Sequence, residues 1–206
     1  MILEACVETW AEAEKASLRG AHRIELCSHL ELDGLTPNEK LIQKTCLGLD
    51  IPVMVMIRPR GGNFVYSEEE LQRMESEIDM AKANGAYGIV FGLLTPDNKI
   101  DVDNTDRLAR RASPLPVTFH KAIDNLIDPV EGVTALREIH GITRILTSGG
   151  KPTALEGAEI LRKMIETAGD NLTILVAGRV TNENANTIAE ITGATELHGR
   201  KIVGIL

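Results

Sequence analysis

The 206-residue sequence predicts a single α/β domain, a (β/α)8 barrel of the triosephosphate-isomerase type spanning residues 1–206. Three observations predict this fold. Short runs rich in Val, Ile and Leu alternate eight times with longer helical patterns, as expected for parallel strands buried on both faces. No Gly-x-Gly-x-x-Gly motif follows the first run, which disfavours the doubly wound open sheet, the main alternative. No linker or low-complexity segment divides the chain.

The expected strands are the eight apolar runs. They cover approximately residues 2–6, 22–27, 51–57, 86–93, 116–120, 142–147, 172–177 and 195–198. The first two share one pattern, because ILEAC (2–6) and RIELC (23–27) each place a glutamate two residues before a cysteine. Residues two apart on a strand lie on the same face. Each of these strands therefore presents one carboxylate and one thiol on a single face.

Helices are expected between the strands, where a capping residue is followed three residues later by an acidic one. The pairs are Thr9 with Glu12, Ser67 with Glu70, Asp128 with Glu131 (Pro129 lying in the first turn), and Thr153 with Glu156. Helix ends are expected where glycine supplies a left-handed cap before the next strand. These glycines are Gly20, Gly85, Gly141 and Gly193.

The end of the chain departs from the regular alternation. After the last expected strand only residues 199–206 remain, and they include Ile202, Val203, Ile205 and Leu206. This segment is too short for a normal closing helix, so the last helix of the barrel is expected to be short or missing. The last strands then lack their usual apolar cover. A homo-oligomer that hides this edge is therefore predicted.

Composition excludes several classes of partner. The formal net charge is −8 and aromatic residues make up 3% of the chain, so a nucleic-acid partner is not expected. The longest apolar run near the N-terminus is too short to span a membrane, and no secretory signal opens the chain. A cytoplasmic location is therefore predicted. Its three cysteines are expected to be free thiols in that reducing compartment.

Polar side chains gather where the expected strands end, which is where barrel enzymes carry their chemistry. Glu4 with Cys6 and Glu25 with Cys27 end the first two strands. Later strands end in further charged, polar or glycine residues: Arg58 and Arg60, His120, Ser148-Gly149-Gly150, Arg179, and Glu196 with His198. If the glutamates, cysteines and arginines all face inward, they converge on one mouth. Buried carboxylates need a partner, and Arg58 and Arg60 are expected to supply it.

Five segments, taken together and in this order, resemble the copper homeostasis protein CutC family. They are RIELCS, LELDGLTP, MIRPRGG, TFHKAID and RILTSGG. The resemblance covers essentially the whole chain. It implies a barrel fold, a cytoplasmic location and a role in handling copper.

A copper site is the first functional hypothesis. Thiolates are soft donors suited to Cu(I), and neighbouring strands lie about 4.8 Å apart, so Cys6 and Cys27 are the predicted metal ligands. The alternative interpretation is that both are small buried apolar residues. Cys46 lies in helical register with Ile42 and Leu49, and is predicted to pack in the core.

The second hypothesis is an enzyme of the lyase, aldolase or isomerase type, acting on a small anionic or phosphorylated metabolite. The anion would be held by six residues with help from Lys151: Arg58, Arg60, Ser148, Gly149, Gly150 and Arg179. Glu4, Glu25 or His120 would then move a proton. A copper carrier needs two sulfurs but does not need Arg58, Arg60 and two carboxylates at the same mouth. Both hypotheses therefore stay open. No lysine stands inside an expected strand, which argues against Schiff-base aldolase chemistry.

Overall fold

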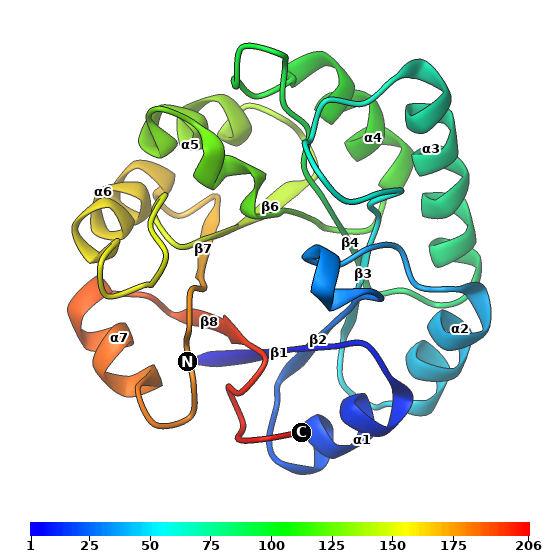
Figure 1. The fold of residues 1–206 in the computed structure, drawn as a ribbon, viewed down its shortest axis with the longest axis horizontal. Helices are drawn as coiled ribbons and strands as arrows, with labels where there is room; N and C mark the ends of the chain where they lie inside the picture. The colour runs from blue at the N-terminus through cyan, green and yellow to red at the C-terminus, as the bar shows by residue number, and fades with distance from the viewer.

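The computed structural model describes residues 1–206 as a closed barrel of eight parallel strands (Figure 1). The strands pair in chain order, and β1 closes the ring beside β8. Their bounds are β1 Ile2–Val7, β2 Arg23–Leu26, β3 Val53–Met56, β4 Gly88–Phe91, β5 Val117–Phe119, β6 Ile142–Thr147, β7 Thr173–Val176 and β8 Glu196–Gly199. The predicted barrel is confirmed, and most strands are a few residues shorter than the apolar runs that predicted them.

Seven α-helices form the outer layer (Figure 1). They are α1 Trp10–Leu18, α2 Glu39–Gly48, α3 Glu68–Ala83, α4 Val102–Ala112, α5 Pro129–Arg137, α6 Ala158–Ala168 and α7 Ala185–Thr192. Two short 3-10 helices, η1 (Leu30–Leu32) and η2 (Lys121–Asn125), follow β2 and β5. No helix of the structure combines the length and the apolar character needed to span a bilayer.

Strand alternation separates an apolar layer from a polar barrel interior. On β2, Ile24 and Leu26 are fully buried in the large apolar core that also contains the inner faces of the helices. Arg23 and Glu25, on the other face of the same strand, lie inside the barrel with their partners from β1 and β8. The apolar layer supplies the burial that drives folding, and the interior holds charged groups together with a few apolar side chains.

Three of the four predicted caps begin helices. Thr9 and Asp128 accept hydrogen bonds from first-turn N–H groups of α1 and α5, and Ser67 forms a full reciprocal box with Glu70 at α3. The fourth differs: Thr153 and Glu156 make the reciprocal bonds, but α6 begins only at Ala158. The segment before α6 forms turns because Ala154 N–H donates 2.9 Å to Gly178 O, which ties it to the loop after β7.

Three of the four predicted glycine stops are confirmed, because Gly20, Gly85 and Gly193 lie at or directly after the ends of α1, α3 and α7. Gly141 differs, since α5 already ends at Arg137 and Gly141 only precedes β6. All four have φ between +79° and +94°, a backbone conformation that a Cβ atom makes costly.

Residues 200–206 take the place expected for a closing helix, and they contain none. This tail runs beside α1 (Figure 1): Arg200 Nη2 lies 3.3 Å from Glu12 Oε1, and Arg19 Nη1 donates 2.6 Å to Ile205 O. Ile202 is buried in the core, and Leu206 packs against it. The missing helix is therefore confirmed. Because the tail covers part of the edge, the reason for expecting a homo-oligomer is weaker, and the oligomeric state stays a prediction.

The Ser67 cap is expected to stabilise the fold measurably. Ser67→Ala removes one acceptor and strands the N–H of Glu70, so it should lower the free energy of unfolding by about 1 kcal/mol in urea denaturation. Ser76→Ala is the matched control, because Ser76 lies in the same helix and bonds only to the Gln72 carbonyl. An equal loss in both variants would contradict the capping role.

Candidate functional site

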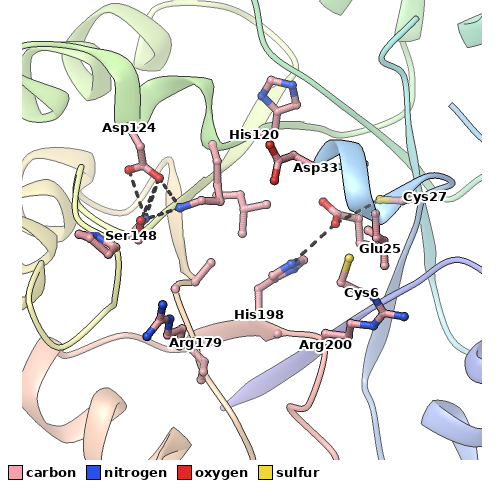
Figure 2. Close-up of a pocket in the computed structure, with 18 of the residues that line it drawn as sticks. Cys6, Glu25, Cys27, Asp33, His120, Asp124, Ser148, Arg179, His198 and Arg200 are labelled. Carbon is pink, nitrogen blue, oxygen red and sulfur yellow. Dashed lines mark hydrogen bonds and ion pairs between the residues drawn. The ribbon is translucent and has the colours of Figure 1, made fainter. Parts of the chain in front are cut away.

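A cavity of about 1010 Å³ opens at the carboxyl ends of the strands (Figure 2). Its wall includes residues from β1, β2, β3 and β8 and from the loops after β5, β6 and β7. Cys6, Glu25, Cys27 and His198 line one side, and Arg179 and Ser148 line another. Most of the residues proposed from the sequence therefore do meet at one mouth.

Below the cavity, Arg23 lies between two carboxylates inside the barrel. It forms ion pairs with Glu4 and with Glu196, and all three side chains are almost completely buried. Arg144 Nε adds a contact of 2.9 Å to Glu196 Oε2. The expectation that Arg58 and Arg60 neutralise Glu4 and Glu25 is therefore wrong. Strand register decides the pairing, because Glu4 stands directly opposite Arg23 on β2.

The same register places His198 beside Glu4 from the other side. Glu4 pairs with His198 across β1 and β8, and His198 Nδ1 lies 2.8 Å from Glu4 Oε1. Although burial opposes ionisation, the His198 hydrogen bond and the Arg23 charge lower the pKa of Glu4 to about 2. A lowered carboxyl pKa stabilises the fold above the ordinary value of 4.5, and this contribution is lost as the pH falls toward 2.

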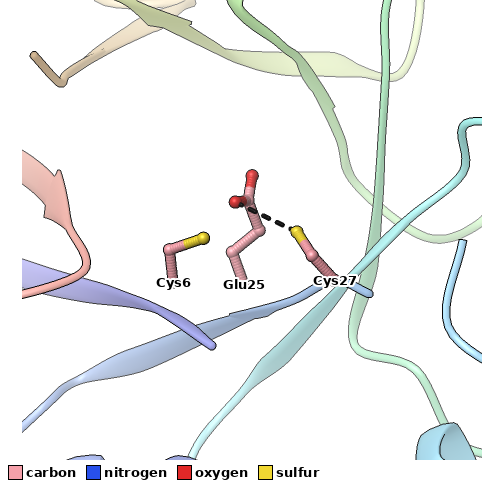
Figure 3. A group of neighbouring side chains, drawn as sticks. All are labelled: Cys6, Glu25 and Cys27. Carbon is pink, nitrogen blue, oxygen red and sulfur yellow. Dashed lines mark hydrogen bonds between the residues drawn. The ribbon is translucent and has the colours of Figure 1, made fainter. Parts of the chain in front are cut away.

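Cys6, Glu25 and Cys27 form a compact cluster at the floor of the cavity (Figure 3). Their Sγ and carboxylate atoms all lie within 4.8 Å of one another. Cys6 stands opposite Glu25 in the pairing of β1 with β2, and the Cys27 thiol donates to Glu25 Oε2 at 3.5 Å. The two sulfurs thus approach each other diagonally across neighbouring strands.

Two methionines join this cluster, and the sequence analysis did not single them out. Met54 and Met56 pack with Cys6 and Cys27 in one small buried group, and Met56 also lines the cavity. The run VMVM on β3 could have predicted them, because residues two apart on a strand share a face and both thioethers therefore point the same way. Four sulfur atoms therefore gather on three adjacent strands.

The environment separates the pKa values of the groups around the sulfurs. Burial opposes the charge of His198, but Glu25, Cys6 and Glu4 together raise the pKa of this imidazole well above 6.5. Hydrogen bonding with Cys27 and the nearby His198 lower the pKa of the Cys6 thiol well below 9.0 despite burial. Burial raises the pKa of Glu25 well above 4.5. These shifts favour a thiolate at Cys6 beside an imidazolium at His198.

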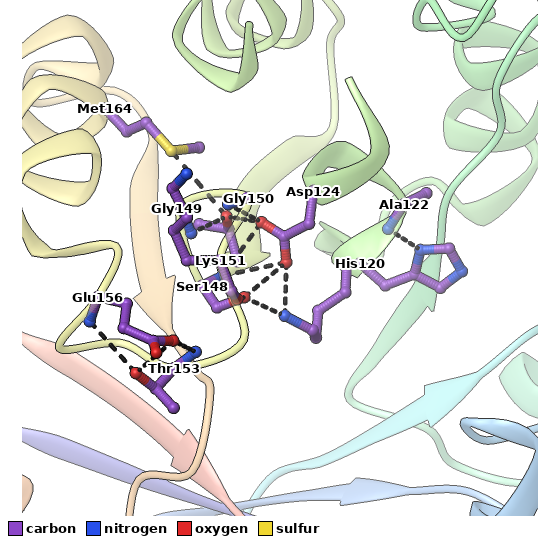
Figure 4. Close-up of polar contacts among 12 residues, drawn as sticks. His120, Ala122, Asp124, Ser148, Gly149, Gly150, Lys151, Thr153, Glu156 and Met164 are labelled. Atoms are coloured by element: carbon purple, nitrogen blue, oxygen red, sulfur yellow. Dashed lines mark hydrogen bonds and ion pairs between the residues drawn. The ribbon is translucent and has the colours of Figure 1, made fainter. Parts of the chain in front are cut away.

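The loop after β6 was predicted to bind an anion. In the structure its N–H groups bind a carboxylate of the protein itself, that of Asp124. The carboxylate of Asp124, in η2, accepts from Ser148 N at 3.1 Å and from Gly150 N at 2.8 Å (Figure 4). Thr147 Oγ1 and Lys121 Nζ bond to the same carboxylate. Gly149 N donates instead to Thr147 Oγ1. The donors of this loop are therefore already occupied.

Sequence reasoning missed Asp124, although it lies in the quoted segment TFHKAID. Its only signal was a carboxylate shortly after a strand end. The pairing depends on η2, which brings Asp124 back over the mouth toward the loop after β6. No local pattern in the sequence specifies that return.

Arg58 and Arg60 do not present free guanidinium groups to the cavity. Arg58 is buried in the wall and donates to the carbonyls of Leu32, Gly34 and Gly62 at 2.7–3.1 Å. Arg60 turns away toward α3, where it pairs with Glu70 and stacks on Tyr66. Both residues hold loops in place rather than an anion at the mouth.

His120 and Arg179 do line the cavity. His120 is buried, and its Nδ1 accepts from Ala122 N at 3.2 Å while its Nε2 has no protein partner. Burial and the Arg58 charge lower the pKa of His120 to about 3, so the ring is neutral. Arg179 is exposed at the rim and forms no ion pair with an acidic group. The remaining predicted core cysteine, Cys46, packs against the core, and burial raises the pKa of its thiol to about 11.

Comparison with known proteins gives a consistent answer. The CutC family matches residues 1–203 of the chain. The human protein called copper homeostasis protein cutC homolog is 43% identical over 197 residues, which is 96% of this chain and 72% of the human one. A CutC protein from Enterococcus faecalis is 39% identical, covering 98% of this chain and all of that protein. A crystal structure of CutC from Streptococcus agalactiae superposes with a TM-score of 0.93 at 33% identity, covering 98% of this chain and 99% of that one.

The buried Arg23 pairs are expected to be essential for stability. Arg23→Met leaves two carboxylates without their partner, so the free energy of unfolding should fall by about 3–5 kcal/mol in urea denaturation. Lys163→Met is the control, because the exposed Lys163–Glu159 pair should contribute less than about 1 kcal/mol. Arg23→Lys keeps the positive charge but not the two-sided guanidinium contact, so its loss of stability should lie between those of the other two variants. Equal stability of Arg23→Met and the unmodified protein would refute this role.

The thiols should differ in reactivity at neutral pH. Iodoacetamide attacks thiolates, so Cys6 should be alkylated before Cys46, although Cys46 is the more exposed of the two. Peptide mass spectrometry at increasing times measures both rates. His198→Gln removes the imidazolium and should slow the reaction of Cys6 while leaving Cys46 unchanged. Faster labelling of Cys46 would show that access, and not pKa, controls these residues.

Proposed function

Because this chain belongs to the CutC family of copper homeostasis proteins, we propose that it handles copper by binding Cu(I) between Cys6 and Cys27 at the mouth of the barrel. In this proposal copper is a cargo that is bound and released, and no reaction is catalysed on it. The observation that carries the proposal is the cluster in which the two sulfurs and the Glu25 carboxylate lie within 4.8 Å of one another.

The donor set matches the chemistry of Cu(I). Soft thiolates and thioethers favour this ion, whereas carboxylates and carbonyls favour harder cations such as Mg²⁺. Cys6 and Cys27 supply two thiolates, and Met56 adds a thioether in the same buried group. Burial raises the pKa of Glu25, which favours its neutral form beside the sulfurs. A cluster of sulfur donors of this kind should bind a soft ion such as Cu(I) in preference to harder divalent cations such as Mg²⁺.

Charge balance also supports the proposal. Two thiolates and one Cu(I) ion carry a net charge of −1, which is costly to bury without a nearby cation. His198 supplies that cation beside the thiolate of Cys6, and it is anchored by Glu4 at 2.8 Å. The pKa of the Cys6 thiol is lowered, whereas the pKa of Cys27 is raised by the neighbouring Cys6 sulfur and by burial. Copper binding at neutral pH should therefore release a proton from Cys27.

Exposure of the sulfurs suits retention of the ion. Cys6 is 8% exposed and Cys27 is 1% exposed, so the ion would be shielded but still reachable from the cavity. All three cysteines of the chain are free, and a reducing compartment keeps them available as thiols. We therefore propose that the protein acts in the cytoplasm.

Competition with a chromogenic Cu(I) chelator under anaerobic, reducing conditions tests the site. The unmodified protein should withdraw one equivalent of Cu(I) from the chelator, and the Cys6→Ser/Cys27→Ser variant should bind at least 100-fold more weakly. Cys46→Ser is the matched control and should bind like the unmodified protein, since Cys46 lies on α2, outside the sulfur cluster. Unchanged affinity in the double variant would refute the proposed site.

A further inference from the structure

A Cu(I) ion accounts for only a small part of the cavity, and the opposite rim carries unused positive charge. Six Lys or Arg side chains line the cavity: Arg58, Lys121, Lys151, Arg179, Arg200 and Lys201. Three of them already have partners, since Arg58 binds loop carbonyls, Lys121 binds Asp124, and Arg200 reaches Glu8 and Glu12. Lys151, Arg179 and Lys201 pair with no acidic group. On a chain of net charge −8, three unpaired cations on one rim form a local positive site.

The same rim offers backbone donors. The N–H groups of Gly178, Arg179 and Val180, directly after β7, donate to no protein acceptor. Gly178 has φ +103° and Arg179 has φ +56°, so the chain makes a left-handed turn at the edge of the cavity. The loop after β6, by contrast, is filled by Asp124. Backbone donors free to bind an external anion therefore lie on the loop after β7, which carries Arg179 of the predicted anion site, and not on the loop after β6.

The far wall carries buried polar atoms without partners. Because His120 Nδ1 accepts from Ala122, the proton of the neutral ring lies on Nε2, which has no acceptor in the protein. Glu25 Oε1 is also buried without a partner. Both residues line the cavity, and Figure 2 shows His120 and Arg179 on opposite sides of it. Buried polar groups normally have partners, and a ligand bound in this cavity would supply them to both residues.

We propose that the mouth of this barrel binds a small organic molecule that carries a phosphate group. The phosphate lies on Arg179, Lys201 and Lys151, with the N–H groups of 178–180 as donors, and the organic part extends toward His120 Nε2 and Glu25. A dianion matches three cations and three N–H groups better than a single carboxylate does. Loops after the seventh and eighth strands are also where barrels of this type frequently hold phosphate.

The phosphate group of this ligand is separate from the copper site, although the organic part extends toward Glu25, which belongs to the sulfur cluster. The phosphate contacts lie on the loops after β6, β7 and β8, whereas Cys6 lies on β1 and Cys27 directly follows β2. The two proposals therefore fail independently. Loss of Cu(I) binding in the cysteine variant does not remove the phosphate contacts, and loss of those contacts leaves the thiols in place.

Isothermal titration of the copper-free protein tests the proposal with three probes: inorganic phosphate, ribose 5-phosphate and ribose. We expect ribose 5-phosphate to bind at least 10-fold more tightly than inorganic phosphate, and ribose not to bind. Arg179→Asn/Lys201→Gln should weaken both phosphate probes at least 10-fold, and asparagine tolerates the left-handed backbone at 179. Arg162→Gln is the matched control, because Arg162 is exposed on α6 outside the cavity, and it should change nothing.

Two further variants separate the parts of the proposal. His120→Asn should weaken ribose 5-phosphate but not inorganic phosphate, and Cys6→Ser/Cys27→Ser should bind both as the unmodified protein does. Failure of both phosphate probes to bind, or binding unaffected by Arg179→Asn/Lys201→Gln, would overturn the site. Equal affinity for inorganic phosphate and ribose 5-phosphate would overturn the organic ligand and indicate free phosphate instead.

Discussion

The ion pairs of Arg23 inside the barrel are the constraint on which the rest of the site depends. Barrel interiors of this type are usually filled by layers of branched apolar side chains. Here Glu4, Arg23 and Glu196 fill the lower part of the interior, and each is almost completely buried. Isolated charges at such depth would be very costly, so the three groups are tolerable only together. Their geometry follows from the closed sheet, which sets Arg23 opposite Glu4.

This network determines the chemistry one step above it. Glu4 is held ionised by Arg23, so it stabilises the imidazolium form of His198. The charged His198 in turn favours the thiolate of Cys6. The contacts therefore run in series from Arg23 to Glu4, from Glu4 to His198, and from His198 to the Cys6 sulfur. The repeated Glu-x-Cys pattern of the first two strands carries two roles, because Glu4 belongs to the network and Glu25 stands between the sulfurs.

Asp124 occupies the donors of one loop at the mouth, the loop after β6, and leaves those of the loop after β7 unoccupied. Its carboxylate satisfies the N–H groups of the loop after β6, which fixes that loop against η2. Positive charge on the neighbouring loops after β7 and β8 is left without an internal partner. The sulfur cluster and the unpaired cations therefore lie on different sides of one cavity.

The sequence by itself determined the barrel, the order of its elements, most helix caps, and that Glu4 shares a strand face with Cys6 and Glu25 with Cys27. These features depend on local periodicity, capping chemistry and strand alternation, all of which are written in short stretches of residues. Only the tertiary structure decided that Arg23, and not Arg58 or Arg60, pairs with Glu4, that Asp124 fills the loop after β6, and that the tail packs beside α1. Those pairings join residues far apart in the chain or on different strands. They are fixed by strand register and by closure of the barrel, which no local pattern specifies.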